Sequence, residues 1–231
     1  MNWFTEKYDE NVKISYKVDK HLFHTQSKFQ TIDVYNNDLF GNYLVIDDIM
    51  MVTEKDEFIY HEMITHVPMA CNPNIKDVLV IGAGDGGTVR ELCRYESINS
   101  ITMVEIDEEV VNASIKFLPT ISKSLKTDSR VNLLFKDGID FVKNSSNNSY
   151  DLIIVDSTDP IGPGEGLFSI EFYENCYRIL RENGILVNHS ESPYYPFNIK
   201  ELKRSCNKIN KIFPILNYYQ AFIPTYPSGH W

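Results

Sequence analysis

The sequence lacks the features of an exported or membrane protein. Its 231 residues include four cysteines, all far apart and none in a Cys-x-x-Cys pair, which disfavours a disulfide framework and favours a reducing compartment. The first residues show no basic start followed by an apolar stretch, and no apolar run approaches the roughly 20 residues that span a bilayer. We therefore expect no signal peptide, no membrane partner and a cytoplasmic location.

Basic residues are scarce relative to acidic ones. The chain has 22 Lys and Arg against 32 Asp and Glu, a net charge of −10, which disfavours nucleic acid as a partner and weakly favours cationic ligands.

The sequence also lacks histidines at the spacing of a metal-binding helix. His61 and His66 are five residues apart, whereas a zinc-binding HExxH helix places two histidines four apart on one face. We expect no metal site.

The pattern of apolar residues predicts an α/β protein with two parts. Residues 1–55 alternate apolar and polar side chains between Asn/Asp turns, which indicates a small antiparallel β-hairpin domain. Residues 56–231 alternate strands with helices, which indicates a mostly parallel sheet with helices on both faces. The predicted strands of this second domain are 77–82, 101–106, 131–136, 151–156, 184–190 and 219–224, and the predicted helices are 56–66, 87–96, 108–118, 169–181 and 196–211.

A glycine-rich loop follows the first of these strands. Residues 82–87 (GAGDGG) match the GxGxxG pattern, and Glu105 follows at the end of the second strand, where an acid can accept ribose hydroxyl groups. Asp85 lies inside the loop. Its carboxylate would repel a pyrophosphate but attract a ligand with an ammonium and a sulfonium group. The loop therefore favours an adenosyl sulfonium compound over a dinucleotide, and Asp85 can also cap the following helix.

Further acids follow two other predicted strands. Asp137 precedes Gly138, and either binds an adenine amino group or only forms a turn. Asp156 and Asp159 follow the strand 151–156 and stand in a stiff Pro/Gly loop. Acids at the carboxyl ends of parallel strands lie where ligands bind, and they are costly there unless they meet a cation. We expect a small cationic ligand.

Five segments together resemble one enzyme family. They are residues 56–63 (DEFIYHEM), 82–87 (GAGDGG), 104–107 (VEID), 137–138 (DG) and 156–163 (DSTDPIGP). In this order and spacing, the chain resembles the polyamine aminopropyltransferases over its whole length. The resemblance implies a methyltransferase-like Rossmann fold preceded by a small β domain, assembled as a homodimer or homotetramer. It implies transfer of an aminopropyl group from decarboxylated S-adenosylmethionine, the co-substrate, to putrescine, giving spermidine and methylthioadenosine without a prosthetic group.

The resemblance also implies roles for individual residues. Asp156 is the catalytic acid that assists deprotonation of the amine, and Asp85 binds the aminopropyl ammonium. The positions implied for the nucleoside are Gln30, Glu105, Asp137, Gly138 and Pro163. Those implied for the amine site are Tyr60, His61, Ser157, Thr158, Asp159 and Tyr226. Without the resemblance, core packing is the better interpretation of both Tyr60 and His61.

Three positions depart from the family pattern, and two other functions stay open. Ala83 and His189 replace a Gly and a Gln of many relatives, and relatives continue for several dozen residues beyond Trp231, so we expect a catalytic domain truncated at its C-terminus. A diamine N-methyltransferase that uses ordinary S-adenosylmethionine would share many motifs, and a non-catalytic polyamine or methylthioadenosine binder would share the site. The acceptor is open between putrescine, cadaverine, agmatine and spermidine.

Overall fold

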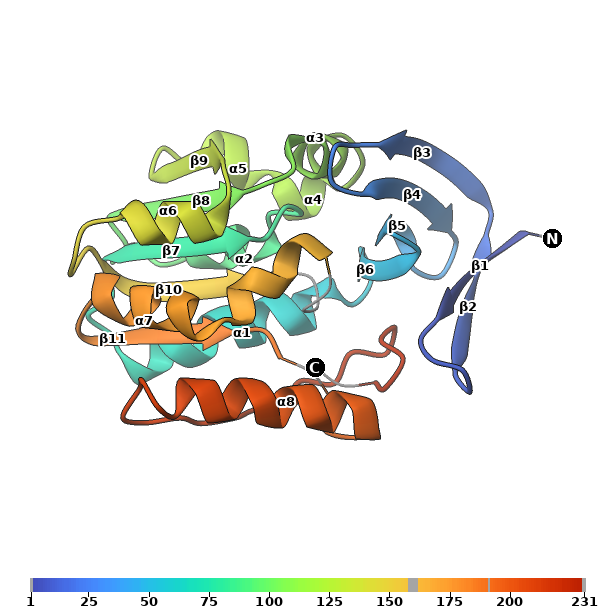
Figure 1. Cartoon of the computed structure of the whole chain (residues 1–231). Coiled ribbons are helices and arrows are strands. Elements are labelled where there is room, and N and C mark those ends of the chain that lie inside the picture. The colour runs from blue at the N-terminus through green and yellow to red at the C-terminus, as the bar shows by residue number, and fades with distance from the viewer. Residues whose placement is uncertain (1, 158–161, 191, 230–231) are drawn as a thin grey trace.

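The N-terminal part of the chain forms two antiparallel sheets. The computed structural model describes residues 2–157, 162–190 and 192–229. A hairpin pairs β1 (Asn2–Lys7) with β2 (Lys13–Val18), and a four-stranded sheet contains, in chain order, β3 (Lys20–Gln26), β4 (Thr31–Asn37), β5 (Gly41–Ile46) and β6 (Ile49–Thr53). The predicted β structure is confirmed. These strands lie at one end of the molecule, to the right in Figure 1.

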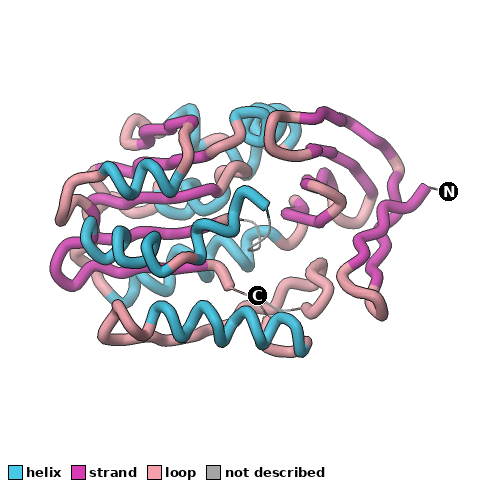
Figure 2. The backbone as a smooth tube through the Cα atoms, viewed as in Figure 1, coloured by secondary structure: helices cyan, strands magenta, loops and turns pink. Residues whose placement is uncertain are grey.

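The larger part is built on a five-stranded parallel sheet. Its strands are β7 (Asp77–Gly82), β8 (Ser100–Glu105), β9 (Val131–Phe135), β10 (Tyr150–Asp156) and β11 (Leu180–Asn188), in the order β11-β10-β7-β8-β9. Successive residues of β7 belong to different cores: Val78 and Val80 pack in one cluster, and Leu79 and Ile81 pack in another. Both faces of the sheet are therefore buried, and the tube view shows the strands between helices (Figure 2). The predicted α/β class is confirmed.

Eight α-helices and one 3-10 helix accompany the strands in the described part of the chain. They are α1 (Glu57–Cys71), α2 (Gly87–Leu92), α3 (Glu108–Phe117), α4 (Pro119–Ser122), α5 (Ser124–Thr127), α6 (Gly138–Asn144), η1 (Gly162–Phe168), α7 (Ile170–Ile179) and α8 (Pro196–Ile209). Ser169 caps α7 by accepting from the Phe172 N–H, and Pro196 opens α8, where its missing N–H is harmless. No helix of this described part is long and apolar enough to cross a membrane.

The predicted strand 219–224 is wrong. Ala221, Ile223 and Thr225 are buried, and Phe222 and Pro224 between them are exposed, as in a half-buried strand. The segment nevertheless makes only an isolated bridge at Phe222 and joins no sheet within the described residues. Its apolar side chains pack on the core that contains β7 and β10. The alternation of buried and exposed residues shows that this segment is extended and half-buried. A β-strand must also pair with a neighbouring strand, and this segment does not do so within the described residues.

The order of the strands places a crevice at the middle of the sheet. β7 comes first along the chain, with β8 on one side of it and β10 on the other. Connections run in opposite directions from this point, so the loops after β7 and β10 diverge and leave space between them. Gly82 lies directly opposite Asp156 in the pairing of these two strands. The glycine loop and the Asp156 loop thus meet at one edge of the sheet.

Candidate active site

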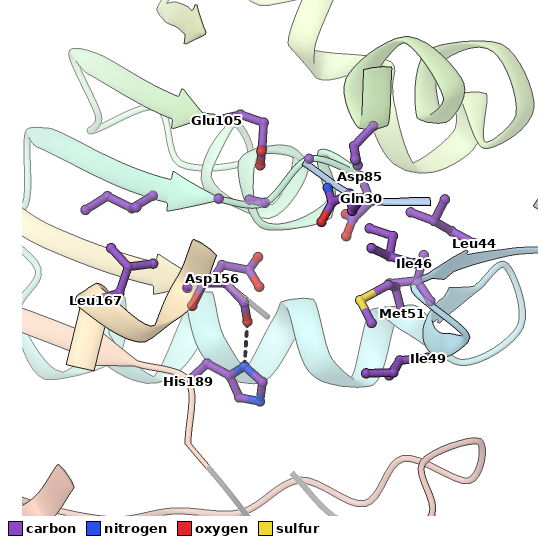
Figure 3. Close-up of a pocket in the computed structure, with 18 of the residues that line it drawn as sticks. Gln30, Leu44, Ile46, Ile49, Met51, Asp85, Glu105, Asp156, Leu167 and His189 are labelled. Atoms are coloured by element: carbon purple, nitrogen blue, oxygen red, sulfur yellow. Dashed lines mark hydrogen bonds between the residues drawn. The ribbon is translucent and has the colours of Figure 1, made fainter. Parts of the chain in front are cut away.

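A pocket lies at this edge, between the carboxyl ends of the parallel strands and the N-terminal β domain. Asp85, Glu105 and Asp156 reach into it from the parallel sheet, and Leu44 and Met51 face them from β5 and β6 (Figure 3). Of the residues predicted from the sequence, the pocket wall includes Gln30, Tyr60, Asp85, Glu105, Asp137, Gly138, Asp156, Ser157 and Tyr226. One side of the pocket is therefore acidic and the other apolar.

The glycine loop rests directly on the end of β10. A Cβ atom on Gly82, whose φ is 83°, would lie 2.0 Å from the carbonyl oxygen of Asp156. The Ala83 N–H donates to that same oxygen at 2.8 Å. Ala83 has a φ of 63°, in the left-handed region where a side chain is unfavourable. The exchange of Gly for Ala noted in the sequence therefore costs backbone strain at the point where the loop turns.

The Asp156 carboxylate is held by two hydroxyl groups. Tyr60 donates to Oδ1 at 2.5 Å, and Thr88 donates to Oδ2 at 2.6 Å. The enclosing protein raises the pKa of Asp156, and the negative charge of Asp85 raises it further against the opposing effects of His61 and the two hydroxyls. Burial also raises the pKa of Tyr60 well above its usual range, so the phenol keeps its proton and stays a donor. Thr88 is a site residue that the sequence analysis missed.

Asp85 belongs to a chain of charges that leads away from the pocket. It accepts from the Gly87 N–H at 2.6 Å and lies 3.2 Å from Nε2 of His61. His61 Nδ1 lies 2.5 Å from Glu57, and Arg90 binds that glutamate through two nitrogens at 2.7 and 3.0 Å. Burial alone would lower the pKa of His61, but Asp85 and Glu57 raise it to about 10. The imidazole is therefore a cation at neutral pH.

His61 does not form part of the pocket wall. The sequence analysis placed it in the amine site, but its side chain is fully buried and lies behind Asp85. The reason is the helix geometry of α1, where His61 is one turn after Glu57 and one position after Tyr60, so Tyr60 faces the pocket and His61 faces the α2 start. A Cβ on Gly87 would come within 2.3 Å of the His61 ring. The last glycine of the loop makes room for this cation.

The opposite end of the pocket contains Glu105 at the end of β8. Burial raises the pKa of this carboxyl group to about 7, against the effect of the backbone N–H groups that bind it. One of these is the Asp107 N–H, which donates to Oε1 at 2.8 Å. A Cβ on Gly84 would lie 3.2 Å from Oε2 and 2.6 Å from Val110. The glycine loop can approach Glu105 closely because this position has no side chain.

Gln30 enters the pocket from the loop between β3 and β4. Its amide donates to Asp107 Oδ2 at 3.0 Å, and Ser27 donates to the same oxygen at 2.6 Å. The other oxygen of Asp107 caps α3 through the Glu109 N–H. Asp107 therefore fastens the N-terminal β domain to the parallel sheet. Its place in the VEID segment was visible in the sequence, but this contact was not.

Asp137, which follows β9, has two roles. Asp137 lines the pocket and also caps α6, where Oδ1 accepts from the N–H groups of Ile139 and Asp140 at 2.7 and 3.2 Å. Asp137 is therefore the N-cap of a helix and not the plain turn residue that the sequence also allowed, and it lies on the pocket wall. A Cβ on Gly138 would lie 2.6 Å from Ile81, so glycine is required for close packing on β7.

The remaining predicted positions surround the end of β10. The Tyr226 hydroxyl donates to the Met51 carbonyl at 3.1 Å, which brings the C-terminal segment against β6. His189 lines the pocket, and its Nδ1 donates to the Ser157 carbonyl at 2.8 Å. Thr158 and Asp159 lie outside the described residues, and so does the side chain of Pro163.

These features define a class of protein: a methyltransferase-like Rossmann fold with a β domain closing an acidic pocket at the switch point of the sheet. The sequence model described as the spermine/spermidine synthase domain matches residues 57–231, and that described as the spermidine synthase tetramerisation domain matches residues 2–54. The chain therefore belongs to the spermine/spermidine synthase family and is a polyamine aminopropyltransferase.

Named relatives agree with this assignment. The polyamine aminopropyltransferase of Clostridioides difficile is 65% identical over 99% of this chain and 81% of its own length, and that of Clostridium botulinum Alaska E43 is 61% identical over 99% and 80%. The crystal structure of a spermidine synthase with the transition-state analogue AdoDATO has a TM-score of 0.95, with 41% identity over all of this chain and 78% of that one. The Thermotoga maritima spermidine synthase has a TM-score of 0.94, with 40% identity over 100% and 77%.

Proposed function

We propose that this chain is a spermidine synthase, which transfers the aminopropyl group of decarboxylated S-adenosylmethionine to putrescine and releases spermidine and methylthioadenosine. The observation that carries the proposal is the pair Asp85 and Asp156, two carboxylates on one pocket wall with opposite pKa shifts. Burial would raise the pKa of Asp85, but the His61 cation and the Gly87 N–H lower it. A donor with a sulfonium and an ammonium group complements such a wall.

The pocket divides into two ends that suit the two parts of the donor. In the proposal, Glu105 accepts the ribose hydroxyls, and Gln30, Asp137 and Gly138 border the nucleoside, because these residues line the end nearest β8 and β9. Asp85 binds the aminopropyl ammonium, because it lines the pocket from the glycine loop and lies close enough to Asp156 to raise the pKa of that carboxyl group. Tyr60, Ser157 and Tyr226 border the acceptor amine, and Thr158, Asp159 and Pro163 remain proposed on the family pattern.

Asp156 is the proposed proton acceptor. The amine nitrogen attacks the carbon attached to sulfur, the C–S bond breaks with its electron pair moving to sulfur, and the leaving thioether is neutral. The nitrogen must therefore lose a proton, and the leaving group needs none. An ordinary carboxylate is a weak base, with a pKa of about 3.9. Enclosure and Asp85 raise the pKa of Asp156, and Tyr60 and Thr88 fix its orientation, so it is a stronger base than a free aspartate.

Discrimination between donors follows from the same charges. Ordinary S-adenosylmethionine carries a carboxylate on the carbon that bears the amino group. In the proposed pose this group would lie beside Asp85 and Asp156, and like charges in an enclosed site repel strongly. We expect the decarboxylated donor to be used and the ordinary donor to be rejected, which argues against a diamine N-methyltransferase.

The test is release of methylthioadenosine with putrescine as acceptor, comparing decarboxylated with ordinary S-adenosylmethionine. We expect product from the decarboxylated donor alone. Asp156→Asn should lower kcat by about 100-fold or more, since a positioned base contributes roughly 10²–10⁴-fold. Asp140→Asn is the matched control, because Asp140 is exposed on α6 and makes the same change of charge away from the pocket wall. Methylated putrescine, or full activity of Asp156→Asn, would contradict the proposal.

The acceptor and the assembly form part of the same proposal. Replacing putrescine with cadaverine, agmatine or spermidine in the assay ranks the acceptors, and we expect putrescine to give the highest kcat/KM. A homodimer or homotetramer is proposed because residues 2–54 match a family described as a tetramerisation domain. The cytoplasm is proposed as its location because the four cysteines are all free.

A further inference from the structure

Three potential metal ligands meet on the N-terminal sheet. His21 and His24 are on β3, and Asp33 is on the neighbouring strand β4. Nε2 of His21 lies 2.6 Å and Nδ1 of His24 lies 2.9 Å from Oδ1 of Asp33, and all ligand atoms of this His21–His24–Asp33 cluster lie within 4.8 Å of one another. None of the three residues lines the pocket described above.

A β-bulge brings the two histidines together. Residues three apart on a regular strand point to opposite faces. The pairing of β3 with β4 shifts between His21 and Phe23, so that His21 is opposite Tyr35 and His24 is opposite Asp33. Tyr35 and Asp33 are two apart and share a face, so both histidines share that face as well. Leu22 and Phe23 both pack on the other side, as one extra residue in the strand requires.

The cluster faces away from the pocket. Ile32 and Val34 flank Asp33 on β4 and pair with Ile46 and Leu44, which line the pocket. Asp33 alternates with them and therefore points to the opposite face of the sheet. A ligand in the cluster would not contact the substrate.

The charge of Asp33 calls for a cation. Its residue is only 7% exposed, and among the described residues no Lys or Arg forms an ion pair with it. Its charge contributes, after burial, to raising the pKa of Tyr35 to about 12. A buried carboxylate without a cation is costly. The side chains of His21 and His24 are 45% and 60% exposed, so an ion from solvent can reach the ring nitrogens.

We propose that His21, His24 and Asp33 bind a divalent transition-metal ion, with Zn²⁺ as the best match. Two imidazoles and one carboxylate, with solvent at a fourth position, are a ligand set that suits Zn²⁺. Ligand atoms of a tetrahedral zinc ion are about 3.3 Å apart, given bonds of about 2.0 Å. The observed distances of 2.6 and 2.9 Å to Asp33 must open by about 0.7 and 0.4 Å, which the exposed histidines allow. The bound ion clamps the edge strand β3 to β4.

A second cluster in the structure provides a contrast. Glu62, His66 and Glu91 also lie within 4.8 Å of one another. Glu91 already binds Arg90 at 2.8 Å and Arg94 at 2.7 Å. These two cations repel a metal ion and occupy its carboxylate ligand. The second cluster is therefore not a metal site, although its composition is similar.

The proposal departs from the sequence analysis, which expected no metal site because His61 and His66 have the wrong spacing. The spacing of three between His21 and His24 also predicts no shared site, because such residues point to opposite faces of a regular strand. The two histidines share a face only because of the bulge, which is known only from the pairing of β3 with β4.

The test is a calorimetric Zn²⁺ titration of the untagged, chelator-treated chain of residues 1–231, followed by Co²⁺ substitution and its visible absorption. We expect one ion per chain, Co²⁺ bands typical of tetrahedral coordination, and a higher melting temperature with Zn²⁺. His24→Gln should weaken binding at least about tenfold, comparable to the loss of a second-shell partner or more, and remove the thermal shift. His24 is exposed, so this variant should fold normally.

Two further variants make the result specific. Asp33→Asn should also weaken binding, because it removes the anionic ligand and keeps the size of the side chain. His66→Gln is the matched control and should bind Zn²⁺ as the unaltered chain does. The absence of saturable binding at pH 7.5, or binding lost in His66→Gln and kept in His24→Gln, would overturn the proposal. The latter would place the metal ion in the Glu62–His66–Glu91 cluster.

Discussion

The pKa values of the two pocket carboxylates, Asp85 and Asp156, shift in opposite directions because the two groups have different neighbours. Asp85 is backed by the His61 cation and the Gly87 N–H, which together lower its pKa against the effect of burial. Asp156 has neutral hydroxyl donors and a neighbouring negative charge, and its pKa is raised. When the environments of two acids push their pKa values apart, the two groups can take different roles in a reaction. Asp85 is suited to hold a cation and Asp156 to accept a proton.

Replacing His61 tests the buried cation. His61→Gln should lower the free energy of unfolding at pH 7 by about 3–5 kcal/mol, because it leaves Glu57 and Asp85 without their shared partner. The folded pKa of about 10 lies above the unfolded value of 6.5. The stabilisation is therefore complete below pH 6.5 and is lost as pH rises through 10.

Urea denaturation of both proteins from pH 6 to pH 10.5 measures this difference. We expect the gap between the unaltered chain and His61→Gln to shrink at the alkaline end. His66→Gln, whose histidine is partly exposed on the same helix, is the matched control and should show only a small gap. A gap for His61→Gln that is constant with pH would show that the imidazole is neutral.

Glu105 should make nucleoside binding depend on pH near neutrality. Burial raises its pKa to about 7 in the empty pocket, and the ionised form is the better acceptor for two ribose hydroxyls. Affinity for methylthioadenosine should thus rise about five- to tenfold between pH 6 and pH 8. Calorimetry at both pH values measures it. Glu105→Gln should bind more weakly and without this pH dependence; an equal pH response in the variant would assign it to another group.

At the scale of elements, the junction of β7 with β10 is the least tolerant part of the fold. Gly82→Ala places a methyl group 2.0 Å from a backbone oxygen at a φ of 83°, and should destabilise the protein by more than about 4 kcal/mol. Gly229→Ala is the control, since Gly229 has a similar φ of 67° but open space around it. Its cost should be about 1 kcal/mol. If urea denaturation gave the same loss of unfolding free energy for both variants, backbone strain and not the clash with the Asp156 carbonyl would explain the requirement for glycine at position 82.

Local patterns predicted most elements and failed where a distant contact decides. The strands β7 and β10 contain continuous apolar runs buried on both faces, so their identity was visible in the sequence. The short helix α6 was missed because its start depends on the Asp137 cap more than on an apolar stripe. The segment 219–224 shows the reverse error, because its apolar residues pack on the core but no strand pairs with it in the described residues.

The same distinction holds in the site. Asp85, Glu105 and Asp156 were predictable because each follows a strand that ends at the same edge of the sheet. Thr88 and Asp107 make contacts across elements that no local pattern encodes. His61 was predicted to line the amine site, but it lies behind Asp85 and outside the pocket wall. Helix spacing alone does not show which neighbouring element covers a given helix face.

At the scale of the whole molecule, the N-terminal strands are expected to join chains. Sedimentation should give a mass of two or four times 26.8 kDa, since residues 2–54 match a family described as a tetramerisation domain. Trp3 on β1 is 55% exposed, an unusual place for a large apolar side chain unless another chain covers it. Trp3→Glu should shift the protein to lighter species, whereas Lys13→Glu on the partner strand should do so less. A single species of 26.8 kDa would contradict this expectation.

The hydrogen bonds from Ser27 and Gln30 to Asp107 join two parts of the chain that also share an apolar cluster, in which β4 and β5 pack against α3. Gln30 also lines the pocket, so a molecule that fills it contacts both parts at once. Heat should consequently melt the two parts in a single cooperative transition. A saturating nucleoside should raise that one transition as a whole and leave no early step in which the β domain separates.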